Sequence, residues 1–176
     1  QITAWLYGRW CSSFAEMTNL PADLRTALDD QFLASLLKLK TTLRAADGTA
    51  KSLFELADGE TIESVLIAAP GRDTVCVSTQ VGCPVGCAFC ASGRGGLVRD
   101  LTAGEIVDQV IYACRCLGRR VSHVVVMGMG EPLLNLDNVM AALDRIGDPS
   151  LLGVGARRVT VSTSGIPEGI RRLAAA

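Results

Sequence analysis

The sequence is short of three features that would narrow its function. It has one histidine, its charges nearly cancel to a formal −1, and no apolar run approaches the length of about 18 residues that spans a bilayer. A single histidine leaves few ligands for a zinc site completed by histidines. The near-neutral charge gives no overall basic signal for nucleic acid. We therefore expect no membrane partner, and any nucleic-acid partner must be argued from motifs.

Cysteine is better represented, with seven residues, but the count is odd. Nothing at the N-terminal end of the sequence resembles a secretory signal. Both observations argue against a disulfide framework, which normally uses paired cysteines in a secreted chain. Reduced thiols in a cytoplasmic protein are the natural alternative.

A chain of 176 residues suits one good-sized domain, or a small domain and a partial one. Residues 1–46 have the pattern of helices with short connections, and Pro21 and Asp23 suit the first turn of the longest helix. An apolar stripe at helical spacing continues that helix through Leu24, Leu28, Phe32, Leu36 and Leu39. We therefore predict a small helical module over 1–46, followed by a main domain over 47–176.

The main domain has the pattern of an α/β fold. Residues 51–56, 62–69 and 74–80 are strand-like and are separated by Asp-Gly and Pro-Gly turns. Thr102 and Glu105 form a capping-box pattern that opens a helix. The elements that follow are a strand over 123–127, a helix over about 137–146, a strand over 158–162 and a helix from Pro167. This alternation predicts a parallel sheet.

The candidate chemistry follows the ends of the predicted parallel strands, where ligands bind in such folds. A cysteine-rich loop follows 74–80, a glycine loop at 128–132 follows the next strand, and a Ser-Thr-Ser-Gly stretch at 162–165 follows the last. The apolar run 124–127 is typical of a strand covered on both faces. Because these strands are too few to close a barrel, we expect the chain to be a fragment that continues at its C-terminal end.

Three cysteines, Cys83, Cys87 and Cys90, stand at offsets of 0, 4 and 7. Iron–sulfur clusters are normally held by four thiolates, so three close ligands would leave one iron open to a small molecule. A structural zinc site needs four ligands, and the next cysteines, Cys114 and Cys116, lie in a helical pattern. We interpret Cys114 as a small buried hydrophobic residue. A non-enzymatic, zinc-stabilised RNA-binding module stays open as an alternative.

This CxxxCxxC spacing, with Phe89 before the last cysteine, resembles the signature of the radical S-adenosylmethionine (SAM) enzymes. The nonapeptide Met-Gly-Met-Gly-Glu-Pro-Leu-Leu-Asn at 127–135 is similar to the RlmN/Cfr family of radical SAM RNA methyltransferases, as are 14–21, 76–83 and 159–165. The resemblance implies a partial (β/α) radical SAM barrel behind a small helical module that contacts RNA. It also implies a [4Fe–4S] cluster on Cys83, Cys87 and Cys90, with SAM at its open iron.

The activity implied by the resemblance is methyl transfer from SAM to C2 of adenine in 23S rRNA and tRNA through a methylcysteine intermediate. The methyl-carrying cysteine would lie outside this chain, and an external electron donor would be a partner. Cfr-like relatives share these motifs and methylate adenine C8 of rRNA, so the alternative position stays open.

Five further residues match functional positions of the family. Gly130, Glu131 and Ser162 match positions that contact SAM, Cys76 matches the second of two reactive cysteines, and Glu63 matches a proton acceptor. Without the resemblance, Cys76 would be assigned to the core and Glu63 to an exposed strand. Glu131 would be a carboxylate at a turn, and Ser162 a cap at a strand end.

Overall fold

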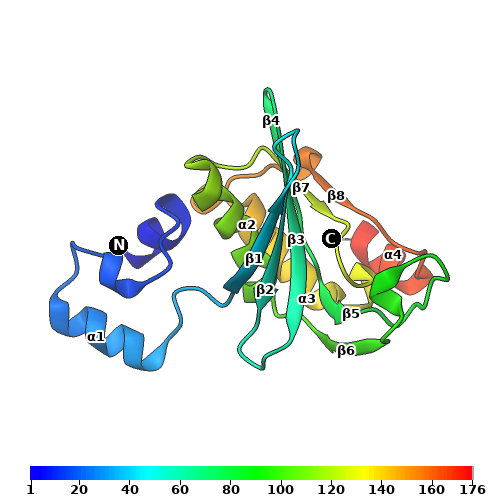
Figure 1. Ribbon diagram of the computed structural model, residues 1–176, viewed down its shortest axis with the longest axis horizontal. Coiled ribbons are helices and arrows are strands. Elements are labelled where there is room, and N and C mark those ends of the chain that lie inside the picture. Colours follow the sequence, from blue (N-terminus) through cyan, green and yellow to red (C-terminus); the bar gives the residue numbers. More distant parts are fainter. Residues whose placement is uncertain (176) are drawn as a thin grey trace.

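The computed structural model describes residues 1–175 and is built around a mixed six-stranded sheet (Figure 1). The strand order is β1-β2-β3-β4-β7-β8, antiparallel from β1 to β4 and parallel from β4 to β8. A separate hairpin pairs β5 with β6. The strands are β1 (Lys38–Arg44), β2 (Ala50–Glu55), β3 (Thr61–Ala69), β4 (Arg72–Cys76), β5 (Gln80–Gly82), β6 (Leu97–Asp100), β7 (His123–Val126) and β8 (Val159–Val161).

In the described part of the chain, four α-helices accompany the sheet, namely α1 (Ala22–Gln31), α2 (Ala103–Leu117), α3 (Leu136–Gly147) and α4 (Pro167–Ala174). The predicted capping box is confirmed, since the Thr102 side chain accepts from the Glu105 amide and the Glu105 side chain accepts from the Thr102 amide. Gly118 ends α2 at a φ of 64°, which glycine adopts without strain. Within residues 1–175, no helix is long and apolar enough to cross a membrane.

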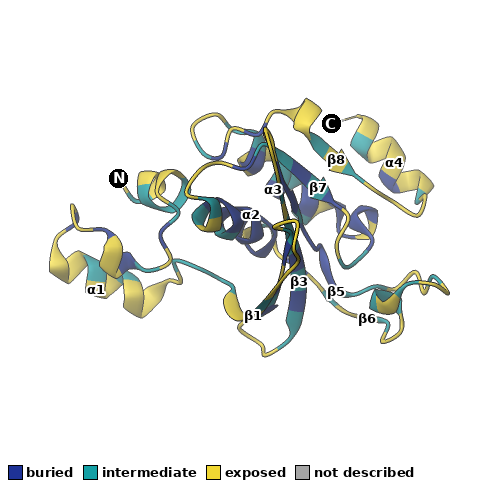
Figure 2. Ribbon diagram, turned by 45° about the horizontal axis from the view of Figure 1, so that its top comes forward, coloured by how far each residue is buried: buried dark blue, intermediate teal, exposed yellow. Residues whose placement is uncertain are grey.

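The main core lies between one face of the sheet and helices α2 and α3 (Figure 2). Val75, Val124 and Val126 bury their side chains on this face. On the other face Val125 is half-buried, and beyond the strand Met127 is 51 % exposed. The expectation that the run 124–127 is covered on both faces is therefore wrong. Alternate residues of β7 meet different environments because successive side chains of a strand point to opposite faces.

The predicted helix through Leu39 is also wrong. Helix α1 ends at Gln31, Phe32 is extended and 58 % exposed, and Leu39 lies in β1. Pairing with β2 decides the conformation of residues 38–44, because backbone bonds to a neighbouring strand outweigh a helical spacing of leucines. Residues before α1 form only a short π-helical turn at Ala4–Gly8 and a 3₁₀ turn at Phe14–Glu16.

The strand predicted over 74–80 is divided in two. β4 ends at Cys76 and β5 begins at Gln80, with Ser78 and Thr79 buried between them. The partner of β5, strand β6, was not anticipated, because its Leu-Val-Arg-Asp sequence is short and carries two charges. The division matters for the site, because the chain leaves the main sheet here and enters the cysteine loop.

Candidate functional site

The three parallel strands end at one edge of the sheet, and the predicted site residues gather along it. Cys76 is the last residue of β4, the glycine loop 128–131 follows β7, and Ser162 follows β8. Such an edge is the usual ligand-binding side of a parallel sheet. The arrangement agrees with the expectation that the three motifs share one rim.

Buried polar side chains fix the segment that enters the cysteine loop. The Ser78 amide donates to Gln109 Oε1 (2.8 Å), and Gln109 Nε2 donates to the Ser78 carbonyl (3.0 Å). Asn135 Nδ2 donates to the carbonyls of Thr79 and Leu101, each at 2.8 Å. A buried amide side chain that replaces missing backbone partners holds an irregular segment in place. Gln109 was not predicted, because a single glutamine in a helix gives no distinctive pattern. Asn135 ends the nonapeptide 127–135, but nothing local indicated that it binds Thr79 and Leu101.

The two glycines of the loop after β7 pack against this same segment. A Cβ on Gly128 would lie 2.6 Å from Ser78 Oγ, and a Cβ on Gly130 would lie 2.6 Å from Gln80 Cβ. Gly130 also has a φ of +101°, which L side chains rarely adopt. The Glu131 amide then donates to Gln80 Oε1 at 2.8 Å. Close approach to the protein's own backbone thus accounts for both glycines.

The cysteine loop closes the hairpin of β5 and β6. The Cys83 amide donates to the Gly96 carbonyl (2.9 Å) and the Cys90 amide donates to the Cys87 carbonyl (3.0 Å). All three thiols are free and partly exposed. Hydrogen bonds from the Ser92 amide and hydroxyl lower the pKa of Cys90, which favours the thiolate form that binds iron. The chemistry of the donors on this loop therefore fits a thiolate-held cluster, although among residues 1–175 the three thiols are not gathered around one point.

An ion-pair cluster anchors the far arm of the hairpin. The Arg99 guanidinium, on β6, donates to both oxygens of Glu105 at 3.0 and 2.8 Å and also contacts Asp58. Since Glu105 caps α2 at the same time, one carboxylate ties the cysteine loop to the start of that helix. Bidentate arginine–carboxylate pairs fix the relative orientation of the two side chains in addition to pairing their charges.

A cavity of about 270 Å³ lies between the sheet edge and the cysteine loop. It is lined by Glu63 from β3, Cys76 from β4, Cys90 and Ser92 from the loop, and Met129 from the glycine loop. Burial raises the pKa of the Cys76 thiol, and a backbone hydrogen bond from Met127 only partly offsets it. The Glu63 carboxylate pairs with Lys51 Nζ at 3.0 Å.

Hydroxyl groups align the two strands behind this cavity. Ser64 Oγ donates to the Cys76 carbonyl (2.8 Å), and Ser78 Oγ donates to the Glu63 carbonyl (2.6 Å). Ser78 Oγ in turn accepts from the Met129 amide at 2.9 Å. These serines were not singled out from the sequence, because serine in a strand is common and its partners lie far along the chain.

Glu131 is 97 % buried, at 3 % exposure, and its carboxylate is fully engaged. Oε1 accepts from the Leu133 amide (3.0 Å) and Thr163 Oγ1 (2.7 Å), while Oε2 accepts from the amide and hydroxyl of Ser164. Burial alone would raise the pKa of Glu131, but these hydrogen bonds outweigh it and the pKa is lowered. The four donors occupy the sites at which a carboxylate accepts.

The structure brings together some of the predicted residues and separates others. Glu63, Cys76 and Cys90 line one cavity, whereas Glu131 faces the loop after β8. Ser162 is exposed, with its amide donating to the Val126 carbonyl (3.2 Å). Across residues 1–175, no three His, Cys, Asp or Glu side chains are grouped closely enough to hold a metal ion.

Comparison with known proteins supplies two family matches. The radical SAM superfamily matches residues 77–176, and the ribosomal RNA large subunit methyltransferase N-terminal domain matches residues 1–33. The probable dual-specificity RNA methyltransferase RlmN of Thermotoga neapolitana is 49 % identical over 175 residues, covering 99 % of this chain and 51 % of that protein. The protein of the same name from Symbiobacterium thermophilum is 51 % identical over 177 residues, covering 99 % and 48 %.

The fold has a close counterpart among solved structures. The crystal structure of a radical SAM methyltransferase from Sphaerobacter thermophilus superimposes with a TM-score of 0.94 at 45 % identity, covering 98 % of this chain and 52 % of that one. The chain thus spans about half the length of the relatives that it matches.

Proposed function

The chain belongs to the radical SAM superfamily, and from this premise we propose that the whole protein is an RNA methyltransferase of the cytosol. It transfers a methyl group from SAM to C2 of adenine in 23S rRNA and tRNA through a methylcysteine intermediate. RNA and an external electron donor are its partners. The relatives named as dual-specificity RNA methyltransferases support this assignment.

One observation carries the proposal. The cavity at the carboxyl ends of the parallel strands is bounded by Cys90 of the cysteine loop on one side and by Cys76 and Glu63 on the other. A thiolate loop for a cofactor and two groups able to exchange protons therefore face the same space. A metal-stabilised binding module would have no need of that second pair.

Cys83, Cys87 and Cys90 would hold the [4Fe–4S] cluster, and Gly130, Glu131 and Ser162 would contact SAM. When bound, the cluster and SAM supply radical chemistry, which methylation of a carbon that is not nucleophilic requires. The hydroxyls of Thr163 and Ser164 can rotate away from Glu131, whereas the amides of Leu133 and Ser164 are fixed. Glu131 can therefore bind the amino group of SAM only if that group replaces the Thr163 or Ser164 hydroxyl as a hydrogen-bond donor to the carboxylate.

The chain's own residues serve the later proton transfers. Because burial raises the pKa of Cys76, its Sγ carries a proton at neutral pH. Glu63, partly exposed in the same cavity, can accept the proton that leaves C2. Once deprotonated, Cys76 Sγ then forms a disulfide with the sulfur of the methyl-carrying cysteine, which we place in the remainder of the protein. The bond between that sulfur and the RNA-linked carbon breaks, the carbon keeps the electron pair and takes up a proton, and the external electron donor later reduces the disulfide.

The test is methylation by the full-length protein, reconstituted with iron and sulfide under anaerobic conditions. An RNA fragment of the large ribosomal subunit and a tRNA are each incubated with labelled SAM and a reductant, then digested to nucleosides. We expect labelled 2-methyladenosine from both RNAs. Labelled 8-methyladenosine would show that the methylated position is C8, as in the Cfr-like relatives. If a cluster-loaded protein yields no labelled nucleoside, the proposal is refuted.

A further inference from the structure

Helix α2 presents a stripe of four residues to the N-terminal part of the chain. Gly104, Asp108, Ile111 and Arg115 are spaced by four, three and four residues, so they share one face of the helix. This face adjoins the one that fills the main core through Ile106, Val110 and Cys114, and Ile111 at its edge also belongs to that core. We refer to the four residues as the α2 stripe. Each of them meets residues that precede β1.

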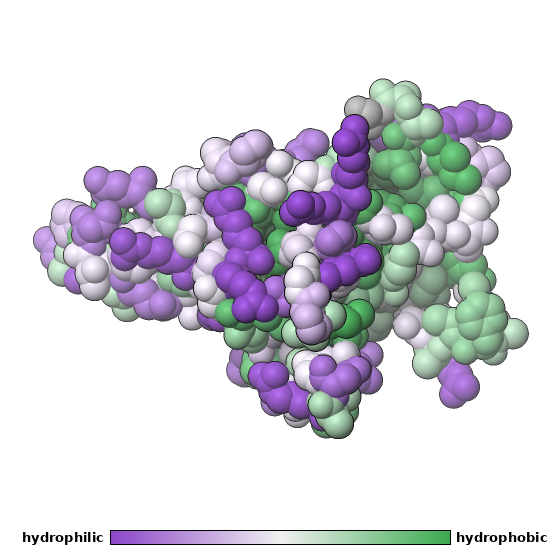
Figure 3. Space-filling model, turned by 90° about the horizontal axis from the view of Figure 1, so that it is seen from above, coloured by the Kyte–Doolittle hydropathy of each residue, from purple (hydrophilic) through white to green (hydrophobic). Residues whose placement is uncertain are grey.

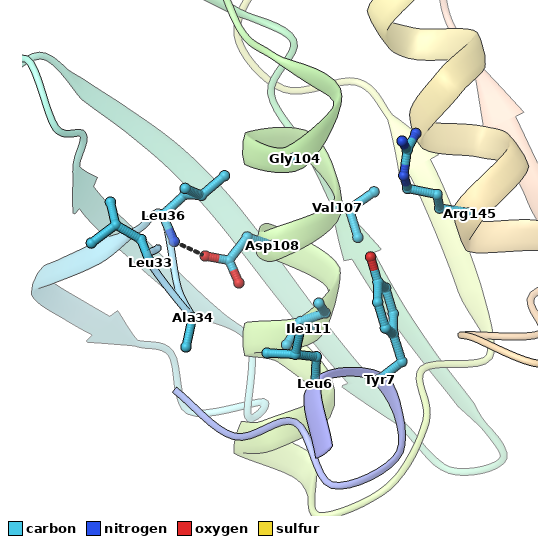
Figure 4. A pocket seen from close by; sticks show the side chains of 10 residues that line it. All are labelled: Leu6, Tyr7, Leu33, Ala34, Leu36, Gly104, Val107, Asp108, Ile111 and Arg145. Carbon is cyan, nitrogen blue, oxygen red and sulfur yellow. Dashed lines mark hydrogen bonds between the residues drawn. The ribbon is translucent and has the colours of Figure 1, made fainter. Parts of the chain in front are cut away.

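Asp108 is the most telling member of the stripe, because it is a carboxylate at only 5 % exposure. Its Oδ2 accepts from Ser35 Oγ (2.8 Å), the Leu36 amide (2.7 Å) and the Leu37 amide (3.1 Å), as Figure 4 shows for Leu36. Burying a charged group is costly unless hydrogen bonds compensate it. Here all three hydrogen bonds come from the segment that joins α1 to β1, and the proposed chemistry makes no use of Asp108.

Arg115 holds a second point of the N-terminal segment, about two helical turns after Asp108. Its guanidinium donates to the carbonyl of Trp10 and to that of Cys11, the latter at 3.0 Å. Trp10 has a φ of +54°, an unfavourable conformation for a bulky residue. Strain of this kind persists only where surrounding contacts hold it. The Arg115 contacts are such a restraint.

Gly104, the first residue of the stripe, has no side chain and so leaves room for the side chain of Leu36. A Cβ at this position would lie 2.8 Å from Leu36 Cδ1, so the packing of Leu36 uses the room that glycine provides. Glycine is a poor helix former. Its presence in the first turn of α2 is explained by the contact with residues 33–37 rather than by the helix itself.

The N-terminal segment also touches the main core through Tyr7, Trp10 and Leu37. It has its own small core of Cys11, Phe14, Met17 and Leu20, separate from the main one. In Figure 3 it forms a largely hydrophilic lobe at one side of the molecule. A cavity of about 220 Å³, lined by Leu6, Tyr7, Asp108 and Ile111 among others, remains between the lobe and α2 (Figure 4).

We propose that the α2 stripe is a docking surface that fixes the orientation of residues 1–37, and that Asp108, Arg115 and Gly104 are positioning residues for the substrate RNA. The RNA part of this inference rests on the proposed function. The N-terminal lobe and the hairpin with the cysteine loop lie on opposite sides of the sheet (Figures 1 and 2). Residues 1–33 match the N-terminal domain of ribosomal RNA methyltransferases, which links the lobe to the RNA substrate. Releasing the lobe should alter how RNA is presented, and its separation from the cysteine loop should leave cofactor binding unchanged.

The test compares three full-length variants, Gly104→Gln, Asp108→Ala and Arg115→Met, with the control Arg157→Met. Arg157 is an exposed arginine in the 3₁₀ turn before β8. Gly104→Gln is the sharpest variant, because it raises the helix propensity of α2 while pushing Leu36 away. Three quantities are measured: chymotryptic cleavage within residues 32–37, KM and kcat for RNA, and iron content with RNA-independent SAM cleavage.

We expect cleavage within 32–37 to become about tenfold faster in the three variants, since local opening governs proteolysis. KM for RNA should rise about fivefold or more, because even a small displacement of a substrate can raise the free energy of its productive complex considerably. Iron content, RNA-independent SAM cleavage and the control should stay at wild-type values.

Three results would overturn the inference. Unchanged cleavage would show that the stripe does not hold the lobe, and faster cleavage with an unchanged KM would show that docking does not position RNA. A loss of iron parallel to the rise in KM would make these residues general supports of the fold. If the wild-type protein methylates no RNA, the proposed function fails by itself, while cleavage still decides whether the stripe is a dock.

Discussion

Ser164 binds the carboxylate of Glu131 twice, through its amide at 2.7 Å and its hydroxyl at 2.8 Å. The contact joins the loop after β7 to the loop after β8, so a residue assigned to SAM also serves as a structural brace. Both roles depend on the ionised form of Glu131.

Glu131→Gln should lower the free energy of unfolding by about 1–3 kcal/mol at pH 7, because a buried acceptor loses charge-assisted hydrogen bonds. The folded-state pKa of Glu131 lies below its ordinary value. Its contribution is therefore present above that ordinary value and is lost as pH falls through the folded-state pKa. Urea unfolding of both proteins between pH 7 and acid pH should show the difference shrinking on acidification. A difference that grows towards acid pH would contradict the lowered pKa.

Gly128→Ala should destabilise the protein by about 1–3 kcal/mol, since the added Cβ would press on Ser78 Oγ and on the Val77 carbonyl at 2.7 Å. Gly155→Ala is the matched control, because no atom lies within 4 Å of a Cβ placed there. We expect that control to change stability by no more than about 0.5 kcal/mol. Thermal unfolding of the two variants measures the contrast, and equal effects would mean that the close packing of the loop after β7 is unimportant.

Replacing any one of Cys83, Cys87 and Cys90 by Ala should abolish binding of the cluster in the full-length protein. Cys114→Ala should bind as much iron as the wild type. Cys114 is buried, its pKa is raised by burial, and its sulfur accepts from the Val121 amide at 3.4 Å. Iron and sulfide analysis after reconstitution gives the result. Loss of iron on changing Cys114 would assign it to the ligands.

Cys76→Ala in the full-length protein should retain the cluster and cleave SAM, because Cys76 lies in β4 rather than in the cysteine loop. Its failure should come at product release, as RNA covalently trapped on the protein. Denaturing electrophoresis should show a slow-migrating RNA–protein species in this variant alone. Cys116→Ala, at an exposed thiol of α2, is the control. Normal methylation by Cys76→Ala would return that residue to a packing role.

Local signals in the sequence predicted the regular part of the fold well. The capping box of α2 and Pro167 at the start of α4 were both located, because each depends on chemistry within a few residues. β1 was missed because its conformation depends on pairing with β2, and a row of leucines at helical spacing masked it. Non-local pairing of this kind is what a single sequence shows least clearly.

The site was predictable only in part. The cysteine spacing and the glycine loop are compact motifs, and the structure puts both at the carboxyl edge of the sheet. The supports behind them are scattered over the chain. Gln109 contacts Ser78 and Arg99 contacts Glu105 and Asp58, so their partners become known only when the strands are assembled. Thr163 and Ser164 lay within a motif, yet nothing local indicated that they bind Glu131.

The central claim is that Cys83, Cys87 and Cys90 hold an iron–sulfur cluster with one iron open to SAM. The most direct measurement is electron paramagnetic resonance of the full-length protein, reconstituted anaerobically and reduced, before and after addition of SAM. The account predicts the signal of a reduced [4Fe–4S] cluster that changes when SAM binds. Stoichiometric zinc without iron uptake, or a cluster signal that SAM leaves unaltered, would contradict it.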